Sequence, residues 1–245
     1  MVEVVRTAPD GATVSVTIPA TAGILNWHAA IRFTGVMFTR DFTIAPAGAQ
    51  KAIPHRILPG ARAQTVRGNG FDLVVYEAAD RSDGALVIAG PYHEAHTWFG
   101  GPVPRTGVLN RLVSMVDFVD SPTGARVTPA AGTDLQQHGV MVVGSDARTT
   151  IMIKDARQER DRIPAFRGLV RDDAEVWRYR MDLRDEEATR LAGTPYEWRY
   201  MYANPTAVFD VSFRDRPAPG AAADAAVGDE HVNTVLAGLR VTWAG

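Results

Sequence analysis

The two stretches VWRYRMDL (176–183) and YEWRYMY (196–202) carry the clearest period-two alternation of the chain. Successive side chains of a β-strand point to opposite faces, so this alternation predicts two strands that each bury one face. In the first stretch Trp177, Tyr179, Met181 and Leu183 alternate with Arg178, Arg180 and Asp182; in the second Tyr196, Trp198, Tyr200 and Tyr202 alternate with Glu197, Arg199 and Met201.

The segment RDEEATRLAGTP (184–195) between these strands has a different pattern. Its acidic residues come first, an arginine comes late, and Gly193 and Pro195 follow. Acidic groups at the start of a helix and a basic group near its end complement the helix dipole, and glycine commonly ends a helix. The sequence therefore predicts one short helix near 185–193, and it predicts no other.

Short β-rich runs separated by turn residues fill the rest of the chain. Gly, Pro, Asp and Ser mark the turns, because each favours a turn conformation for its own steric or hydrogen-bonding reason. A long extended run at 28–44 is interrupted by Gly35, where we expect a bulge or bend. Hairpins are predicted at 2–18, 71–89, 111–128 and 139–153, and single strands at 207–213 and 235–243.

This pattern predicts an all-β, predominantly antiparallel fold, built as a β-sandwich or a barrel-like sheet. We expect a single β-rich unit over 1–245 with a candidate internal boundary at 99–107, where FGGPVPRTG cannot continue a ladder. Residues 215–230 are mostly small and include two prolines, so they predict a flexible loop or tether before a C-terminal strand. That strand either closes a long hairpin or adds to the sheet edge of a neighbouring copy.

Composition excludes several classes of function. The formal charge of −2 gives no general attraction to nucleic acid or to anionic lipid. The chain has no cysteine, which excludes disulfides, thiolate nucleophiles and thiolate metal sites. The start MVEVVRTAPDG (1–11) lacks the apolar region of a signal peptide, and no stretch reaches 18 apolar residues. We therefore expect no membrane partner and a location in the cytoplasm or in a virion-like particle.

The stretch PYHEAHTW (91–98) is the strongest candidate for chemistry. Histidines three apart on a strand point to opposite faces, so His93 and His96 are expected to diverge. A metal site would need a loop that gathers both, with His138 as third ligand. We favour a hydrogen-bonded turn, expect no metal and no cofactor, and keep His93, Glu94, His96 and His138 as weak catalytic candidates. No nucleotide-binding or serine-hydrolase motif occurs, so an enzyme is not favoured.

Arginine is unusually frequent, since Lys51 and Lys154 are the only lysines among 26 basic Lys and Arg residues. That bias is typical of high-GC coding sequence. The span 157–199 holds ten arginines and ten acidic residues, so it offers no net charge to phosphate. A salt-bridged surface or subunit interface is favoured over nucleic acid, because arginine is enriched at protein interfaces.

The aromatic residues of the stretches 176–183 and 196–202 are expected to share one face of a hairpin. On that face they form cross-strand core pairs, line an apolar cup for a small ligand, or make a strip that binds another protein. The candidate ligand or interface residues are Trp177, Tyr179, Trp198, Tyr200, Tyr202, Arg178, Arg180 and Arg199.

Two functions of different classes follow from these observations. The first is a non-catalytic β-rich assembly or interaction protein that forms a homo-oligomer, in its specific form a phage or phage-tail-like component of a high-GC bacterium. The alternative is a small-molecule-binding sandwich or barrel, including a histidine-dependent metal enzyme with an aromatic-lined pocket.

Overall fold

The computed structural model describes residues 1–20, 25–36, 38–68, 70–214 and 229–245. The fold is mostly antiparallel β-structure, as the alternating sequence pattern predicts. Its contacts divide the chain into two compact units that are discontinuous in sequence. Unit 1 comprises 1–5, 13–27 and 142–245, and unit 2 comprises 6–12 and 28–141.

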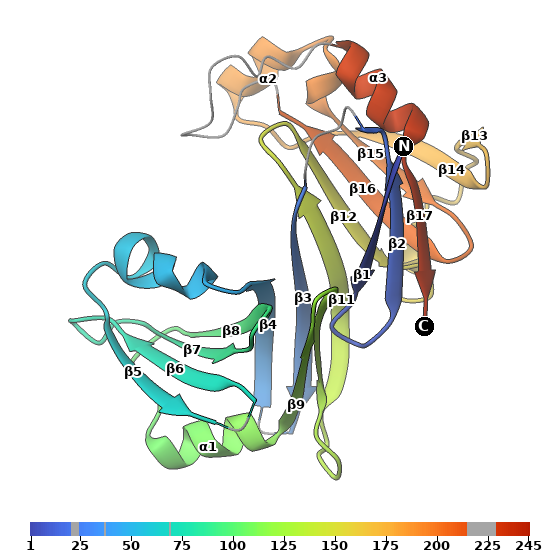
Figure 1. The fold of residues 1–245 in the computed structure, drawn as a ribbon. Helices are drawn as coiled ribbons and strands as arrows, with labels where there is room; N and C mark the ends of the chain where they lie inside the picture. Colours follow the sequence, from blue (N-terminus) through green and yellow to red (C-terminus); the bar gives the residue numbers. More distant parts are fainter. Residues whose placement is uncertain (21–24, 37, 69, 215–228) are drawn as a thin grey trace. The chain divides into compact units, whose positions relative to one another are not determined.

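Unit 1 is a sandwich of two antiparallel sheets (Figure 1). Tyr202, Phe209 and Val211 of the larger sheet are buried, as are Val16 and Val241 of the smaller sheet. The larger sheet has the order β13 (Leu169–Arg171), β14 (Ala174–Arg180), β15 (Trp198–Ala203), β16 (Ala207–Phe213) and β12 (Thr149–Asp155), followed by residues 142–145 of β11 (Gln136–Ser145). The smaller sheet has the order β1 (Val2–Thr7), β2 (Thr13–Ile18) and β17 (Arg240–Ala244).

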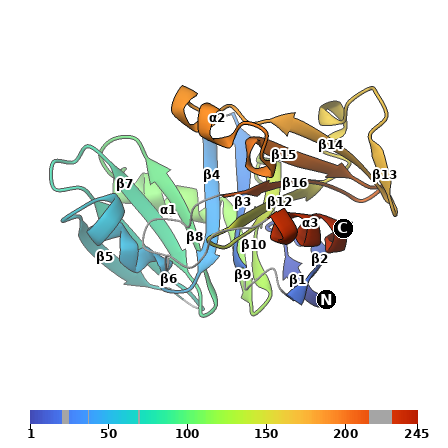
Figure 2. The same ribbon diagram turned by 90° about the horizontal axis from the view of Figure 1, so that it is seen from above.

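Helix α3 (Asp229–Gly238) completes the core of unit 1. Val232, Val235 and Leu236 are buried at helical spacing, so one face of the helix is apolar, and Leu239 is buried directly after it. Figure 2 shows α3 next to β2 on one side of β16. The hydroxyl of Tyr202 donates to the carbonyl oxygen of Leu236 at 3.1 Å, which ties the helix to the sheet.

Unit 2 contains an antiparallel sheet whose central strands are buried on both faces, because the consecutive residues 85–88 are all buried. Two short helical turns, η2 (Ala49–Ala52) and η3 (Ile53–Ile57), place Ile53 against Val74, Tyr76, Ala85 and Val87. The strand order is β3 (Asn26–Gly35), β4 (Phe38–Pro46), β8 (His93–Phe99), β7 (Gly84–Ala89), β6 (Asp72–Glu77) and β5 (Arg62–Arg67). A separate hairpin of β9 (Val116–Ser121) and β10 (Gly124–Pro129) follows α1 (Thr106–Ser114).

Most predicted strands and hairpins are confirmed by these bounds. The predicted helix near 185–193 is present as α2 (Asp185–Leu191), and the 3-10 turn η5 (Pro195–Glu197) leads into β15. The extended run at 28–44 is a hairpin of β3 and β4, with Gly35 as the last residue of β3. The sandwich is realised in unit 1, and no sheet closes into a barrel within the described residues.

Two helices contradict the expectation of a single helix. The sequence predicts the start of a strand at residues 111–114, which belong to α1, and a strand at residues 235–238, which end α3. Over so short a stretch, their apolar residues fit both the period of two of a strand and the period of 3.6 of a helix. Burial of one helical face favours the helix. No helix of the described residues has both the length and the apolar character needed to cross a bilayer.

The sequence predicts a candidate domain boundary at 99–107 and a flexible loop over 215–230. Residues 99–107 lie inside unit 2 and run from the last residue of β8 through the connection into the start of α1. The loop predicted over 215–230 lies outside the described residues up to 228, and Asp229 and Glu230 begin α3.

Candidate functional site

The register of β14 and β15 separates the aromatic residues onto two faces. Trp177 lies opposite Met201 and Arg178 lies opposite Tyr200. Residues opposite one another in an antiparallel pair share a face of the sheet. The expectation that all five aromatic residues share one face is therefore wrong: Trp177 and Tyr179 lie on one face with Arg199 and Met201, and Trp198, Tyr200 and Tyr202 lie on the other with Val176, Arg178 and Arg180.

The face with Tyr200 and Tyr202 points into the sandwich. The Tyr202 ring stacks on Phe209 with a centroid distance of 4.8 Å, and Tyr200 meets Phe213 edge-on at 6.1 Å. These are cross-strand core contacts. At the end of the same face, the guanidinium of Arg178 lies 4.5 Å from the ring centroid of Trp198. Its neighbour Arg180 lies 5.8 Å from that ring, so Trp198 is held by two cations.

The opposite face is covered by the chain that follows β12. Trp177 packs there with Ala156, Met201 and Val208. Its indole Nε1 donates to the carbonyl oxygen of Phe166 at 3.0 Å. This bond holds residue 166 of the segment 163–168 beside the edge of the Trp177 ring.

Gly168 marks the closest approach of this segment to the sheet. A Cβ at this position would lie 2.8 Å from both the Trp177 ring and the carbonyl oxygen of Val176. The Gly168 amide also donates to Glu175 Oε2 at 2.9 Å. Glycine is required here because any side chain would meet backbone and a buried ring.

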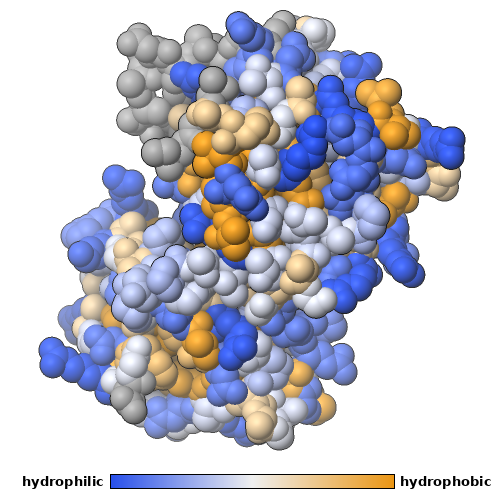
Figure 3. Space-filling view, turned by 45° about the vertical axis from the view of Figure 1, so that its right-hand side comes forward, coloured by the Kyte–Doolittle hydropathy of each residue, from blue (hydrophilic) through white to orange (hydrophobic). Residues whose placement is uncertain are grey.

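The segment leads into β13, which pairs with β14 alone and ends the strand order of its sheet. Three large apolar side chains are exposed along it: Phe166 at 68%, Leu169 at 71% and Val170 at 65%. An edge strand leaves backbone N–H and C=O groups unpaired, and exposed apolar side chains beside it favour association. The space-filling view shows hydrophobic side chains exposed among charged ones (Figure 3).

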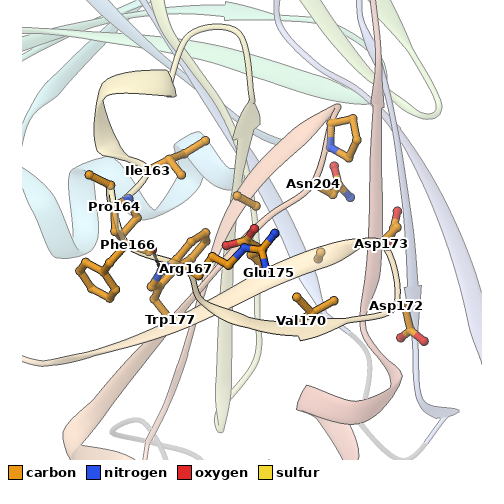
Figure 4. A pocket seen from close by; sticks show the side chains of 14 residues that line it. Ile163, Pro164, Phe166, Arg167, Val170, Asp172, Asp173, Glu175, Trp177 and Asn204 are labelled. Atoms are coloured by element: carbon orange, nitrogen blue, oxygen red, sulfur yellow. Dashed lines mark hydrogen bonds between the residues drawn. The ribbon is translucent and has the colours of Figure 1, made fainter.

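A groove of about 560 Å³ runs beside β13. Figure 4 shows Ile163, Phe166 and Trp177 at one end of the groove and Asp172, Asp173 and Asn204 at the other. The groove therefore combines an apolar floor with a charged rim. We define the β13 surface as Phe166, Arg167, Leu169, Val170 and Asp173.

Two rim charges of the β13 surface have no partner within the described residues. Asp172, at a positive φ of 53°, pairs with Arg240 at the turn of the hairpin. By contrast, neither Arg167 nor Asp173 forms an ion pair or a side-chain hydrogen bond in the described part of the chain. Both charges are available to a molecule that binds in this place.

A second groove, of about 440 Å³, lies along Tyr179, Arg199 and Asp210. Arg162 connects two buried carboxylates there, with Nη1 2.7 Å from Glu159 Oε2 and Nη2 2.9 Å from Asp210 Oδ2. Burial would raise the pKa of Glu159, but its hydrogen bonds with Lys154 and Arg162 outweigh that effect and lower the pKa. The other oxygen of Asp210, Oδ1, is buried without a hydrogen-bond partner among the described residues.

The candidate histidines have separate partners. His93 Nδ1 lies 2.9 Å from Asp120 Oδ1, and His138 Nε2 lies 2.9 Å from Thr34 Oγ1. His96 Nε2 lies 3.1 Å from Glu94 Oε2, on the other face of β8 from His93. Within the described residues, no three His, Asp or Glu side chains are grouped so that they could hold a metal ion.

The carboxylate of Glu94 is used in hydrogen bonds that hold the fold. Its buried carboxylate accepts the backbone N–H of Gly48 at 2.6 Å and of Gln50 at 2.7 Å. Burial raises the pKa of Glu94, but the hydrogen bonds from His96, Gln50 and Gly48 outweigh it, so the pKa is lowered. The carboxylate thereby fixes the turn between β4 and η2 to β8.

The candidate ligand or interface residues of the sequence lie on β14 and β15, and none lies on β13 or in the segment before it. Phe166, Leu169 and Val170 were not among the candidates, and neither was Asp210. The stretch PAFRGLV (164–170) carries a weak signal, since three large apolar side chains stand there beside Gly168 without a regular period. Comparisons with models of protein families, with curated proteins and with solved structures find no match to this chain.

Proposed function

We propose that this chain is a non-catalytic β-rich assembly protein that binds other protein subunits through the β13 surface. The observation that carries the proposal is an unpaired edge strand flanked by three large exposed apolar side chains and an adjacent groove. Phe166 and Val170 line the groove, whereas Leu169 is exposed on the opposite face of the same edge strand. Apolar side chains surrounded by a polar rim are typical of protein interfaces.

The polar groups of the stretch PYHEAHTW support an assembly role over a catalytic one. Glu94 binds two backbone amides and His96, and His93 binds Asp120. Glu94 and His96 are both buried, so this pair has little access to a substrate and is used to hold β8 and its neighbouring turn.

The specific form of the proposal is a phage-tail-like structural component. The arginine-rich, lysine-poor composition and the many hairpins support it, and both observations are general in nature. Negative-stain imaging of the purified protein tests this form. Closed rings or tubes of a fixed diameter are expected, and a uniform population of single particles would contradict it.

Association through the β13 surface is tested by measuring molar mass across a concentration series. The paired change Phe166→Ser with Leu169→Ser is expected to shift the protein toward monomer, because it removes apolar area from the interface. Ile57→Ser is the matched control, since Ile57 is an exposed apolar residue of unit 2. A wild-type chain that stays monomeric at every concentration would overturn the proposal.

A second candidate function is binding of a small ligand in the groove along Tyr179, Arg199 and Asp210. The favouring observation is Asp210 Oδ1, since a buried carboxylate oxygen without a donor is costly. Arg199 has no partner within the described residues, so a ligand with a cationic and an anionic group would suit the groove. Thermal stabilisation by L-lysine that is lost in Asp210→Asn would support this function, and equal shifts in both proteins would count against it.

A further inference from the structure

We infer that unit 2 has a binding site for a small amphipathic carboxylate, such as a medium-chain fatty acid, in a cavity beside α1. The site shares no residue with the β13 surface, because every residue that lines the cavity belongs to unit 2. Three properties of the cavity point to this ligand: its apolar lining, two arginines without an acidic partner, and the open space beside Gly107.

The cavity lies next to α1, where β3 ends and β4 begins (Figure 1). Its volume of about 660 Å³ is within the range of small-ligand sites. Leu112 is buried, whereas Val108 is 57% exposed and Val36 is 91% exposed. The apolar lining therefore extends from buried to exposed side chains, and a ligand that covers it removes apolar area from water. The apolar side chains of the lining are Val36, Pro104, Val108, Leu112 and Met115.

The charged groups of the cavity favour an anion. Arg40 and Arg111 line it together with one acidic residue, Asp134. Asp134 Oδ2 accepts the backbone N–H of Val36 at 3.0 Å, so this carboxylate is used to hold the turn between β3 and β4. Neither arginine forms an ion pair with any residue that the structure describes. A ligand carboxylate would supply that partner, in the bidentate geometry that arginine favours.

The two arginines differ in how they are held. The guanidinium carbon of Arg40 lies 5.0 Å from the centroid of the Phe99 ring, and its Nη1 donates to the carbonyl oxygen of Trp98 at 3.5 Å. Arg111 is exposed, and its guanidinium has no hydrogen-bond acceptor among the described residues. The cavity thus has one arginine positioned by the fold and one whose donors are free for a ligand.

Gly107 leaves the cavity open. It stands in the first turn of α1, and an added Cβ would have nothing within 4 Å apart from its own helix and chain neighbours. Its φ is not positive, so neither backbone conformation nor close packing requires glycine at this position. Alanine is a better helix former than glycine. The missing side chain therefore provides space in the cavity at a cost to the helix.

These observations together define the class of ligand. An apolar chain is needed to cover Val108, Leu112 and Met115. Two arginines and one aspartate leave the lining with one excess positive charge, which a single carboxylate neutralises. A small inorganic anion would meet the charge but would leave the apolar lining in water.

Isothermal titration with decanoate, below the concentration at which it forms micelles, tests the site. We expect saturable binding of one decanoate per chain. Decanol has the same apolar chain without the charge and should bind about tenfold more weakly, because it forms no charge-assisted hydrogen bond with the arginines. Acetate has the charge without the chain and should give no measurable binding. No saturable binding of decanoate, or equal affinity for decanoate and decanol, would overturn the inference.

Arg111→Gln tests the recognition of charge. Glutamine is also a good helix former, so α1 should be retained. The decanoate dissociation constant should rise by about tenfold, the scale of one hydrogen bond to a charged group, and decanol binding should be unchanged. Arg105→Gln is the matched control, because Arg105 is exposed directly before α1 and does not line the cavity. Equal weakening by both substitutions would show that decanoate responds to the general charge of this surface, which contradicts the site.

Gly107→Leu tests the place of binding. Its side chain would occupy the cavity, so binding of both decanoate and decanol should be lost. Gly100→Leu is the matched control, because Gly100 also has open space around an added Cβ but does not line the cavity. Far-UV circular dichroism identifies the folded variants. Wild-type affinity for decanoate in folded Gly107→Leu would overturn the inference, and the Arg111→Gln comparison decides independently if that variant does not fold.

Discussion

The indole Nε1 of Trp177 donates a 3.0 Å hydrogen bond to the backbone oxygen of Phe166, eleven residues earlier in the chain. This bond joins a core residue of β14 to the loop that carries the exposed apolar side chains. Trp177 is buried, whereas Phe166 is 68% exposed. The interior of unit 1 thus determines where the β13 surface presents its largest apolar group.

Replacing Trp177 by Phe should loosen this loop. The change removes the hydrogen bond to Phe166 and part of a buried ring, so the free energy of unfolding should fall by about 1–3 kcal/mol. Urea denaturation measures the loss, and amide exchange at residues 166–170 measures the loosening. Trp198→Phe is the control, because Trp198 contacts Arg178 and Arg180 and not the loop. Equal amide exchange rates at residues 166–170 in both variants would show that the hydrogen bond from Trp177 does not hold the loop.

Gly168→Ala should displace the loop without removing any bond donor. The added Cβ would meet the Trp177 ring and the Val176 carbonyl oxygen at 2.8 Å, so the backbone must move. A destabilisation of about 1–3 kcal/mol is expected from such overpacking. Gly60→Ala is a useful comparison, because nothing lies within 4 Å of its added Cβ and its strain comes only from a positive φ. Unchanged fluorescence of Trp177 in Gly168→Ala would contradict the close contact.

Glu94→Gln should lower stability in a pH-dependent way. The folded-state pKa of Glu94 is lowered, so its contribution is present above the unfolded pKa of about 4.3 and is lost as pH falls through the folded value. The variant should lose about 2 kcal/mol at pH 7, the scale of hydrogen bonds to a charged acceptor. The difference from wild type should shrink below pH 4, measured by urea unfolding at several pH values. A constant difference across that range would show that the charge is not responsible.

Arg162→Met should leave two buried carboxylates without their shared partner. Glu159 and Asp210 are both mostly buried, so the loss should be about 2–4 kcal/mol. Adding Asp210→Asn to this variant should recover part of the loss, because the uncompensated charge is removed. A double-mutant cycle by denaturation measures this coupling. Strictly additive effects would indicate that Arg162 and Asp210 do not interact in solution.

The sequence was sufficient to locate most strands and to specify which residues alternate within each. The alternation in 176–183 and 198–202 is local, and so are the turn residues that bound the hairpins, such as Gly84 and Gly124. Side-chain direction within one strand follows from backbone geometry alone, which is why these predictions needed no partner strand. The helix α2 was predictable for the same reason, because its acidic start is a local electrostatic signal.

The relation between strands was not predictable from these local signals. A shift of register by one residue exchanges the two faces, and the sequence contains no turn that fixes β14 against β15, because α2 and η5 separate them. Pairing with β16, which places Tyr202 opposite Phe209, sets the register instead. For this reason the aromatic residues were placed on one face by the sequence and on two faces by the structure.

Local side-chain chemistry thus determined the strand content, the turns and the divergence of His93 from His96. The tertiary structure alone decided which apolar residues are covered, because burial depends on what the rest of the chain places above them. It made Val235 and Leu236 part of a helix packed in a core, and it left Leu169 and Val170 uncovered at a sheet edge. The free energy of burial depends on contacts between residues that are distant in sequence, so it cannot be predicted from a short stretch of the chain.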